Sequence, residues 1–328
     1  MNNFKNSNTA LIGCGYWGTN IAKVLNVIKG DKIVIFDTNI SNAKTLQKRF
    51  TNKFLISKNL EKLIKSKEIN NVILATPPEK NLNLIKLCIK FKKNIFVEKP
   101  GLRSFNEINK ISKLKNSKVL MFGYIYLFNN YIKFIKKFIN NKKNGKLLYL
   151  SFQRQNLGPI RNDVNASYDL SSHDLSIILN LFNKMPKKIK NNSYSILKKN
   201  ISDISNLNFS INNIFFNINN SWLNPEKIRK ITIITSKKML LFNEMEPMNK
   251  IKIFNKYAEY PKISQFDSSY FKKKAKIYQG KNFIPKIKSN DPLKDELLHF
   301  FKCIKDKKKP IPDITFAKKI LKVLNNIN

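Results

Sequence analysis

A glycine-rich loop near the N-terminus constrains this chain more than any other feature. Residues 10–18 read Ala-Leu-Ile-Gly-Cys-Gly-Tyr-Trp-Gly, so a short apolar run leads into the pattern G-x-G-x-x-G. Beyond the loop, Ile21, Val24, Leu25 and Ile28 recur at helical spacing. A strand, this loop and a helix in that order are typical of a dinucleotide-binding βαβ unit.

Three glycines and one aspartate in this region have separate physical tasks. Gly13 permits the tight turn, Gly15 lets the backbone approach a pyrophosphate, and Gly18 allows the helix to pack closely on the strand. The helix N-terminus then faces the phosphates. Asp37 follows Gly18 by nineteen residues, at the end of the next predicted strand, where a carboxylate binds ribose hydroxyls and repels a 2′-phosphate. The sequence therefore predicts NAD in preference to NADP. The alternative, a plain turn with Asp37 as a helix cap, stays open.

The order of predicted elements indicates an α/β protein of two domains. Residues 9–122 alternate strand-like and helix-like segments, which favours a doubly wound parallel sheet. We therefore expect an NAD-binding Rossmann domain at residues 1–123. Two helices are predicted near the C-terminus, at 293–305 and 314–325, and we expect that they could pack back on this domain.

The remaining residues, 124–328, predict an α+β domain for substrate binding or oligomerisation. A helix is expected at 169–182, and residues 188–256 hold several strand-like runs separated by turn residues, as in an antiparallel sheet. Residues 209–218 read as one of these strands. Residues 257–290 are rich in Lys, Ser and Tyr, and we interpret them as a loop, either a lid or an assembly surface.

The positive charge is spread along the whole chain. A formal charge of +41 first suggests a nucleic-acid partner. Only five of the 62 basic residues are arginines, however, and the lysines run through every segment instead of forming one stripe. Because base readout and phosphate forks favour Arg, we expect no specific nucleic-acid partner. The charge should still steer anionic small molecules toward the protein.

Composition also bears on location and on bound metals. No apolar run approaches the roughly 20 residues that cross a bilayer, and the polar N-terminus has no signal core, so we expect a cytoplasmic protein without membrane association. Hydrophobic residues make up 42% of the chain, enough for a packed core. The spacing of His, Cys and carboxylates indicates neither a metal site nor a disulfide framework. The three cysteines are Cys14, Cys88 and Cys303.

Further motifs make the pattern specific. Thr76-Pro77-Pro78 and Glu98-Lys99-Pro100 follow predicted strands. Residues 154–182 contain a predicted helix with an Asp–His pair, and residues 291–313 read DPLKDELLHFFKCIKDKKKPIPD. With the glycine loop, these motifs resemble the glucose–fructose oxidoreductase / inositol 2-dehydrogenase family (Gfo/Idh/MocA). Residues 154–182 resemble the branch often found with nucleotide-sugar and surface-polysaccharide synthesis.

The resemblance implies a Rossmann domain followed by a domain with an open, mostly antiparallel sheet, with the nicotinamide between them. In one departure, the family often has a histidine where this sequence has Asn81, which can form hydrogen bonds but cannot titrate near neutral pH. The expected cofactor-binding residues are Gly13, Gly15, Tyr16, Trp17, Gly18, Asp37, Thr76, Pro77, Asn81, Glu98 and Lys99.

Three residues are expected to be catalytic. Lys99 follows a strand at its carboxyl end, where its ammonium can hydrogen-bond the reacting oxygen and stabilise a developing alkoxide. Asp169 and His173 are spaced i, i+4 and share a helix face, and the resemblance places such a pair near the substrate carbon. His173 can accept the hydroxyl proton, and Asp169 can orient it or bind a sugar hydroxyl. The alternatives are a surface lysine, a helix cap at Asp169 and a core histidine.

Substrate-binding candidates are Tyr124, Arg154 and Arg161, in addition to Asp169 and His173. The arginines suit a phosphate or carboxylate, and a structural salt bridge is the open alternative. The predicted function is NAD-dependent hydride transfer at a sugar carbon, with a nucleotide sugar as substrate and a homo-oligomer as the assembly. Two alternatives remain. One is redox-assisted elimination or hydrolysis with tightly held NAD, and the other is a non-catalytic protein that binds NAD or a nucleotide sugar.

Overall fold

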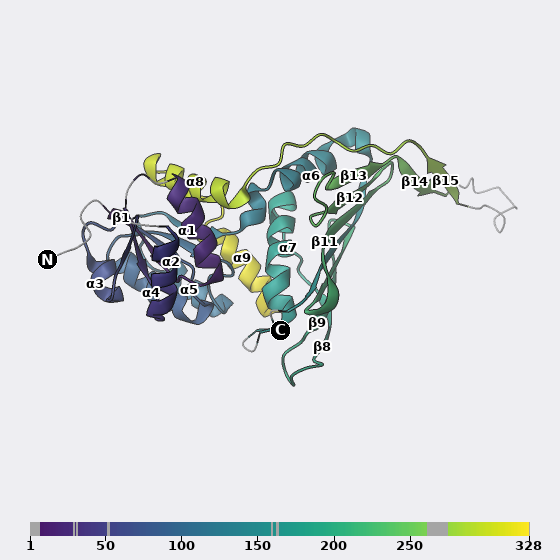
Figure 1. Cartoon of the computed structure of the whole chain (residues 1–328). Coiled ribbons are helices and arrows are strands. Elements are labelled where there is room, and N and C mark those ends of the chain that lie inside the picture. The colour runs from purple at the N-terminus through teal and green to yellow at the C-terminus, as the bar shows by residue number, and fades with distance from the viewer. Residues whose placement is uncertain are drawn as a thin grey trace, which may run out of the picture. The chain divides into compact units, whose positions relative to one another are not determined.

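The computed structural model describes residues 7–28, 30, 32–50, 53–158, 160–161, 164–260 and 275–327. The chain divides into two compact units (Figure 1). The first comprises Met1–Phe128 and Asn290–Asn325, and the second comprises Asn129–Ser289 and Asn326–Asn328. None of the described helices is long and apolar enough to cross a membrane.

The first unit is built on a six-stranded sheet in the order β3-β2-β1-β4-β5-β6, and every pairing in it is parallel. The strand order reverses between β1 and β4, so the carboxyl ends of these two strands form the switch point where α/β sheets bind ligands. The strands are β1 (Ser7–Ile12), β2 (Lys32–Phe36), β3 (Phe54–Ile56), β4 (Asn71–Leu74), β5 (Asn94–Glu98) and β6 (Leu120–Gly123). The connecting helices are α1 (Tyr16–Ile28), α2 (Ile40–Arg49), α3 (Leu60–Lys65), α4 (Pro78–Lys90) and α5 (Phe105–Ser112), with a 3-10 turn, η1 (Ile125–Phe128), after β6.

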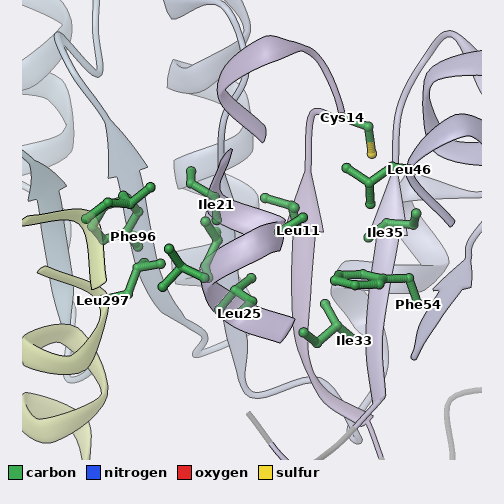
Figure 2. Close-up of a cluster of buried hydrophobic side chains, with 14 of the residues drawn as sticks. Leu11, Cys14, Ile21, Leu25, Ile33, Ile35, Leu46, Phe54, Phe96 and Leu297 are labelled. Atoms are coloured by element: carbon green, nitrogen blue, oxygen red, sulfur yellow. The ribbon is translucent and has the colours of Figure 1, made fainter. Parts of the chain in front are cut away.

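Two C-terminal helices complete this unit. Helix α8 (Pro292–Lys305) packs beside α1, and α9 (Ile314–Asn325) packs against α5 and β6. The apolar face of α8 joins the core that covers the sheet, where Leu297 lies close to Phe96 of β5 and Ile21 of α1 (Figure 2). The rings of Phe96 and Phe300 are 5.8 Å apart in an edge-on arrangement. Burial of one such side chain stabilises the fold by roughly 1.5–3 kcal/mol.

The second unit contains a seven-stranded sheet in the order β13-β12-β11-β7-β10-β9-β8. The β7–β10 pairing is parallel and the others are antiparallel, which confirms the predicted mostly antiparallel sheet. Helix α7 (Ala166–Phe182) packs on β7, β9 and β10. The other elements are α6 (Asn130–Asn140), η2 (Lys142–Asn144), β7 (Leu147–Leu157), β8 (Lys190–Tyr194), β9 (Ile204–Ile211), β10 (Ile214–Ser221), β11 (Leu223–Thr235), β12 (Met239–Asn243), β13 (Ile251–Phe254), β14 (Lys256–Glu259) and β15 (Lys276–Gln279).

Three predictions for this unit need correction. Residues 209–218 are not one strand, because Asn212 and Asn213 both adopt positive φ angles (52° and 62°) and turn the chain into the β9–β10 hairpin. Helix α7 begins at Ala166, three residues before the predicted start, with Asn165 at the N-cap. Residues 257–290 are not all loop, because β14 and β15 pair as a small antiparallel sheet. Residues 261–274 of that segment lie outside the described part of the chain.

Candidate active site

The glycine loop connects β1 to α1 at the switch point of the sheet. Gly13 has φ +96°, and a Cβ atom on it would lie 2.5 Å from the Ala75 carbonyl oxygen. A Cβ atom on Gly18 would lie 2.0 Å from the Gly13 carbonyl oxygen. A Cβ atom on Gly15, by contrast, meets no described atom within 4 Å. Gly13 and Gly18 therefore allow close backbone contacts that a side chain would prevent. Gly15 leaves open space beside the first turn of α1.

Asp37 fixes the loop to the end of the neighbouring strand β2. Its Oδ2 accepts a hydrogen bond from the Cys14 N–H at 2.7 Å, and its Oδ1 accepts one from the Asn39 N–H at 2.8 Å. The Gly13 N–H donates to the Phe36 carbonyl at 2.8 Å. A carboxylate offers about four lone-pair sites, so two remain for hydroxyl donors. Asp37 thus has a structural contact in addition to its predicted contact with ribose.

The first two residues of α1 differ in exposure. Tyr16 is 85% exposed beside the open space at Gly15. Trp17 is half-buried and packs against the core of the first unit. Its indole N–H approaches the Glu98 carboxyl without a well-formed hydrogen bond. Trp17 therefore joins the glycine loop to the strand end that carries Glu98 and Lys99.

The turns after β4 and β5 are linked by Asn81. Pro77 is at the N-cap of α4, and Asn81 is fully buried one turn later. The Thr76 hydroxyl donates to Asn81 Oδ1, and Asn81 Nδ2 donates to the Gly101 carbonyl at 2.7 Å. The amide of Asn81 is thus engaged within the protein, which favours an indirect role in cofactor binding over the direct contact expected from the sequence.

Glu98 is the last residue of β5, and its side-chain carboxyl group is buried. Its Oε2 accepts a hydrogen bond from the Lys99 backbone N–H at 3.2 Å. A Cβ atom on Gly123 of β6 would lie 3.1 Å from Glu98 Cδ, so the carboxyl lies against the backbone of the adjacent strand. Burial raises the pKa of Glu98 to about 7, although the nearby Trp17 indole and Lys99 ammonium both favour the charged form. Lys99 itself is half-buried in the following turn, before a cis peptide bond to Pro100.

Glu296, which the sequence reasoning missed, lies near Glu98. It is 0% exposed on α8, between Leu293, Leu297 and Phe300 of the apolar face. Burial, and then the Glu98 carboxyl, raise the pKa of Glu296 well above its usual value, and the nearby backbone N–H of Tyr124 opposes this rise. The signal was present in the sequence, because a glutamate at a core position of an amphipathic helix predicts a buried carboxyl.

In the second unit, Asp169 and His173 lie one turn apart on α7. Both are half-buried, whereas Ile177 further along the helix is fully buried. The Ser176 hydroxyl donates to the His173 carbonyl at 2.6 Å. Asp169 is not the helix cap, because Asn165 occupies that position. The i, i+4 pair is therefore presented on one face, as its spacing predicts.

The three other substrate-binding candidates have different surroundings. Arg154 of β7 is buried and pairs with buried Asp174 of α7 at 2.8 Å, which favours the structural salt bridge that the sequence left open. Burial raises the pKa of Asp174 despite this partner. Tyr124 is fully buried, with its ring centroid 5.5 Å from that of Phe316. Arg161 is half-buried in the loop between β7 and α7.

Comparison with known proteins identifies a family for the N-terminal part of the chain. Residues 7–126 match the family described as oxidoreductases with an NAD-binding Rossmann fold, Gfo/Idh/MocA. Residues 7–126 therefore have the sequence of a Gfo/Idh/MocA NAD-binding domain. This confirms both the family and the cofactor class that the sequence predicted.

Individual relatives are distant. The chain is 28% identical over 142 residues to an uncharacterised oxidoreductase of Streptococcus pneumoniae, an alignment covering 42% of this chain and 38% of that protein. It is 24% identical over 143 residues to a 2,7-anhydro-N-acetylneuraminate hydratase of Mediterraneibacter gnavus, covering 43% of this chain and 37% of that protein. These alignments therefore span less than half of the curated relatives.

A solved structure of similar fold covers nearly the whole chain. It is the UDP-N-acetylglucosamine 3-dehydrogenase of Acidithiobacillus ferrooxidans, with a TM-score of 0.77 and 17% sequence identity over 98% of this chain and 96% of that one. At this identity the likeness establishes the fold alone.

The residues of the Gfo/Idh/MocA domain fit NAD. The open space at Gly15 would give a pyrophosphate access to the N-terminus of α1, whose first turn carries no acidic residue. Asp37 lies at the end of β2 with two lone-pair sites for ribose hydroxyls. Among the described residues, no group of three His, Cys, Asp or Glu side chains could hold a metal ion.

Proposed function

We propose that this Gfo/Idh/MocA oxidoreductase is an NAD-dependent dehydrogenase that transfers a hydride between nicotinamide and a sugar carbon, with a nucleotide sugar as substrate. One observation carries the proposal. The glycine loop, Asp37, Thr76 and the Lys99 turn follow β1, β2, β4 and β5, which are neighbours in one parallel sheet. Their carboxyl ends therefore meet at a single edge, where such sheets bind cofactors. The similar fold of a nucleotide-sugar dehydrogenase supports the substrate class.

Residues of the chain itself would remove the proton from the substrate hydroxyl. Bound NAD supplies the hydride acceptor. Lys99 hydrogen-bonds the substrate oxygen and stabilises the negative charge that develops as the carbon becomes a carbonyl. His173 takes the hydroxyl proton, and Asp169, one helical turn away, orients the imidazole or binds a neighbouring hydroxyl. The carbon loses one hydride and its oxygen loses one proton, so the alcohol becomes a ketone.

The test is a pair of single variants and their combination. Lys99→Ala and His173→Asn should each lower kcat by roughly 10²–10⁴-fold with little change in the Kd of NAD, because both groups act in the transition state. Since both act on one oxygen, the double variant should lose less than the product of the single losses. Lys86→Ala, on the exposed side of α4, is the matched control and should retain the parent kcat. A stable His173→Asn protein with the parent kcat would refute its catalytic role.

A second function is favoured by one observation, the alignment with a hydratase. In that case NAD would remain bound, and a transient oxidation would assist elimination or addition of water. The two functions differ in their products. Accumulation of NADH in stoichiometric amounts with oxidised sugar supports the dehydrogenase, whereas sugar conversion without net NADH supports the redox-assisted reaction.

A further inference from the structure

We propose that Asn81 is a positioning residue that fixes the Lys99 turn by joining it to the turn after β4. This inference rests on the proposed function, in which Lys99 contacts the reacting oxygen. Asn81 would not contact substrate or cofactor, because both ends of its buried amide are engaged by protein groups.

The contacts of Asn81 require both a donor and an acceptor. Its Oδ1 accepts from the Thr76 hydroxyl, and its Nδ2 donates to the Gly101 carbonyl at 2.7 Å, with a longer contact of 3.5 Å to the Thr76 carbonyl. A planar amide offers both functions at once, whereas an ionised carboxylate only accepts and an aliphatic side chain does neither. Because the side chain is fully buried, loss of the amide would leave the Gly101 carbonyl without this donor and without water to replace it.

Gly101 transmits this constraint to Lys99. Gly101 has φ +84°, and a Cβ atom on it would lie 2.6 Å from the ring of Phe122. Its α-carbon is therefore against Phe122 while its carbonyl is held by Asn81. Two residues earlier, the Lys99 N–H donates to Glu98 Oε2 at 3.2 Å. Glu98 is also the last residue of β5 and pairs with Gly123 of β6, so the sheet holds the segment 98–101 at its first residue and Asn81 holds it at its last. Lys99 lies between these two attachments.

Release of one end should therefore misplace the ammonium without changing its chemistry. A misplacement of about 1 Å can cost about 100-fold in rate. The expected signature is a loss of kcat that is larger than the loss of NAD affinity, because the hydrogen bonds of Asn81 go to Thr76 and Gly101 and not to the glycine loop or Asp37.

The experiment compares Asn81→Leu with Asn94→Leu. Asn94 is buried at the opposite end of β5, where its Nδ2 donates to Asn71 Oδ1 at 3.0 Å and its Oδ1 accepts from the Val119 N–H at 3.2 Å. Both substitutions should lower the melting temperature. Only Asn81→Leu should lower kcat, by about 10- to 100-fold, with the Kd of NAD changing less than about threefold. Asn81→Ser is too short to reach both turns and is the second variant if the leucine protein does not fold.

Two further measurements separate positioning from stability. Hydrogen exchange of the backbone amides in 99–103, measured in the cofactor-free protein, should accelerate in Asn81→Leu or Asn81→Ser but not in Asn94→Leu. Adding Asn81→Leu to Lys99→Ala should cause no further loss of kcat, because the residue acts through Lys99. The inference is overturned if Asn81→Leu and Asn81→Ser keep the parent kcat and exchange rates, or if their losses equal that of Asn94→Leu. If Lys99→Ala retains the parent kcat, the proposed function fails instead, and the exchange data still report whether Asn81 holds the turn.

Discussion

Two glycines of one motif, Gly15 and Gly18, should respond in opposite ways to substitution. A methyl group on Gly18 would lie 2.0 Å from the Gly13 carbonyl oxygen, more than 1 Å inside ordinary contact, so α1 must move away from the loop. Overpacking of this kind typically costs about 1–3 kcal/mol. In a unit of this size, 1 kcal/mol corresponds to about 2–4 °C, so Gly18→Ala should lower the melting temperature by about 2–12 °C.

Gly15→Val should leave the stability nearly unchanged and weaken NAD binding instead. No described atom lies within 4 Å of its Cβ position, so the cofactor-free protein should melt within about 2 °C of the parent. The isopropyl group would instead occupy the space through which the pyrophosphate reaches α1. A loss of at least about 100-fold in NAD affinity, or about 2.7 kcal/mol, is expected.

The assay pairs thermal unfolding by circular dichroism with calorimetric titration of NAD. Gly30→Val is the matched control, because its Cβ position is equally open but lies before β2, outside the glycine loop. It should change neither the melting temperature nor the Kd. Normal NAD binding by Gly15→Val, or an equal loss of stability in Gly15→Val and Gly18→Ala, would refute the division of tasks within the loop.

Three other substitutions test single contacts. Asp37→Ala should narrow an NAD-over-NADP preference and also weaken NAD binding about tenfold, because the carboxylate holds the glycine loop; tighter binding of NADP by the parent would contradict this. Because burial raises the pKa of Glu98 to about 7, the stability from its neutral form is complete below about pH 4.5 and is lost as pH rises through 7. The parent should therefore lose melting temperature relative to Glu98→Gln as the pH rises from 5 to 8. If the difference between the two melting temperatures does not change with pH, Glu98 does not titrate in this range. Arg154→Met should lower the free energy of unfolding by about 3–5 kcal/mol because it leaves the buried Asp174 carboxylate without this partner, and adding Asp174→Leu should restore much of that stability. A stable Arg154→Met protein with a raised KM for substrate would instead support a role of Arg154 in substrate binding.

Local patterns predicted the first unit well because its signals are short in range. Alternating buried strands and amphipathic helices, the spacing of the glycines, and Asp37 at the end of β2 all depend on neighbours within about forty residues. The β9–β10 hairpin was missed because its turn is formed by Asn212 and Asn213, whose positive φ angles are less strongly signalled than those of an Asn-Gly pair. The strand-like residues on both sides of this pair then read as one strand, residues 209–218.

The sequence by itself determined the NAD-binding loop, the parallel sheet and the position of Lys99 at a strand end, because these follow from steric and periodic rules along the chain. Only the tertiary structure decided which distant residues meet. Glu296 reaches Glu98 from a helix almost two hundred residues later, Asn81 joins two turns, and Arg154 pairs with Asp174 inside the second unit. Burial and the pairing of polar groups depend on this packing. The same side chain is a ligand when solvent can reach it and a structural link when a partner within the fold satisfies it.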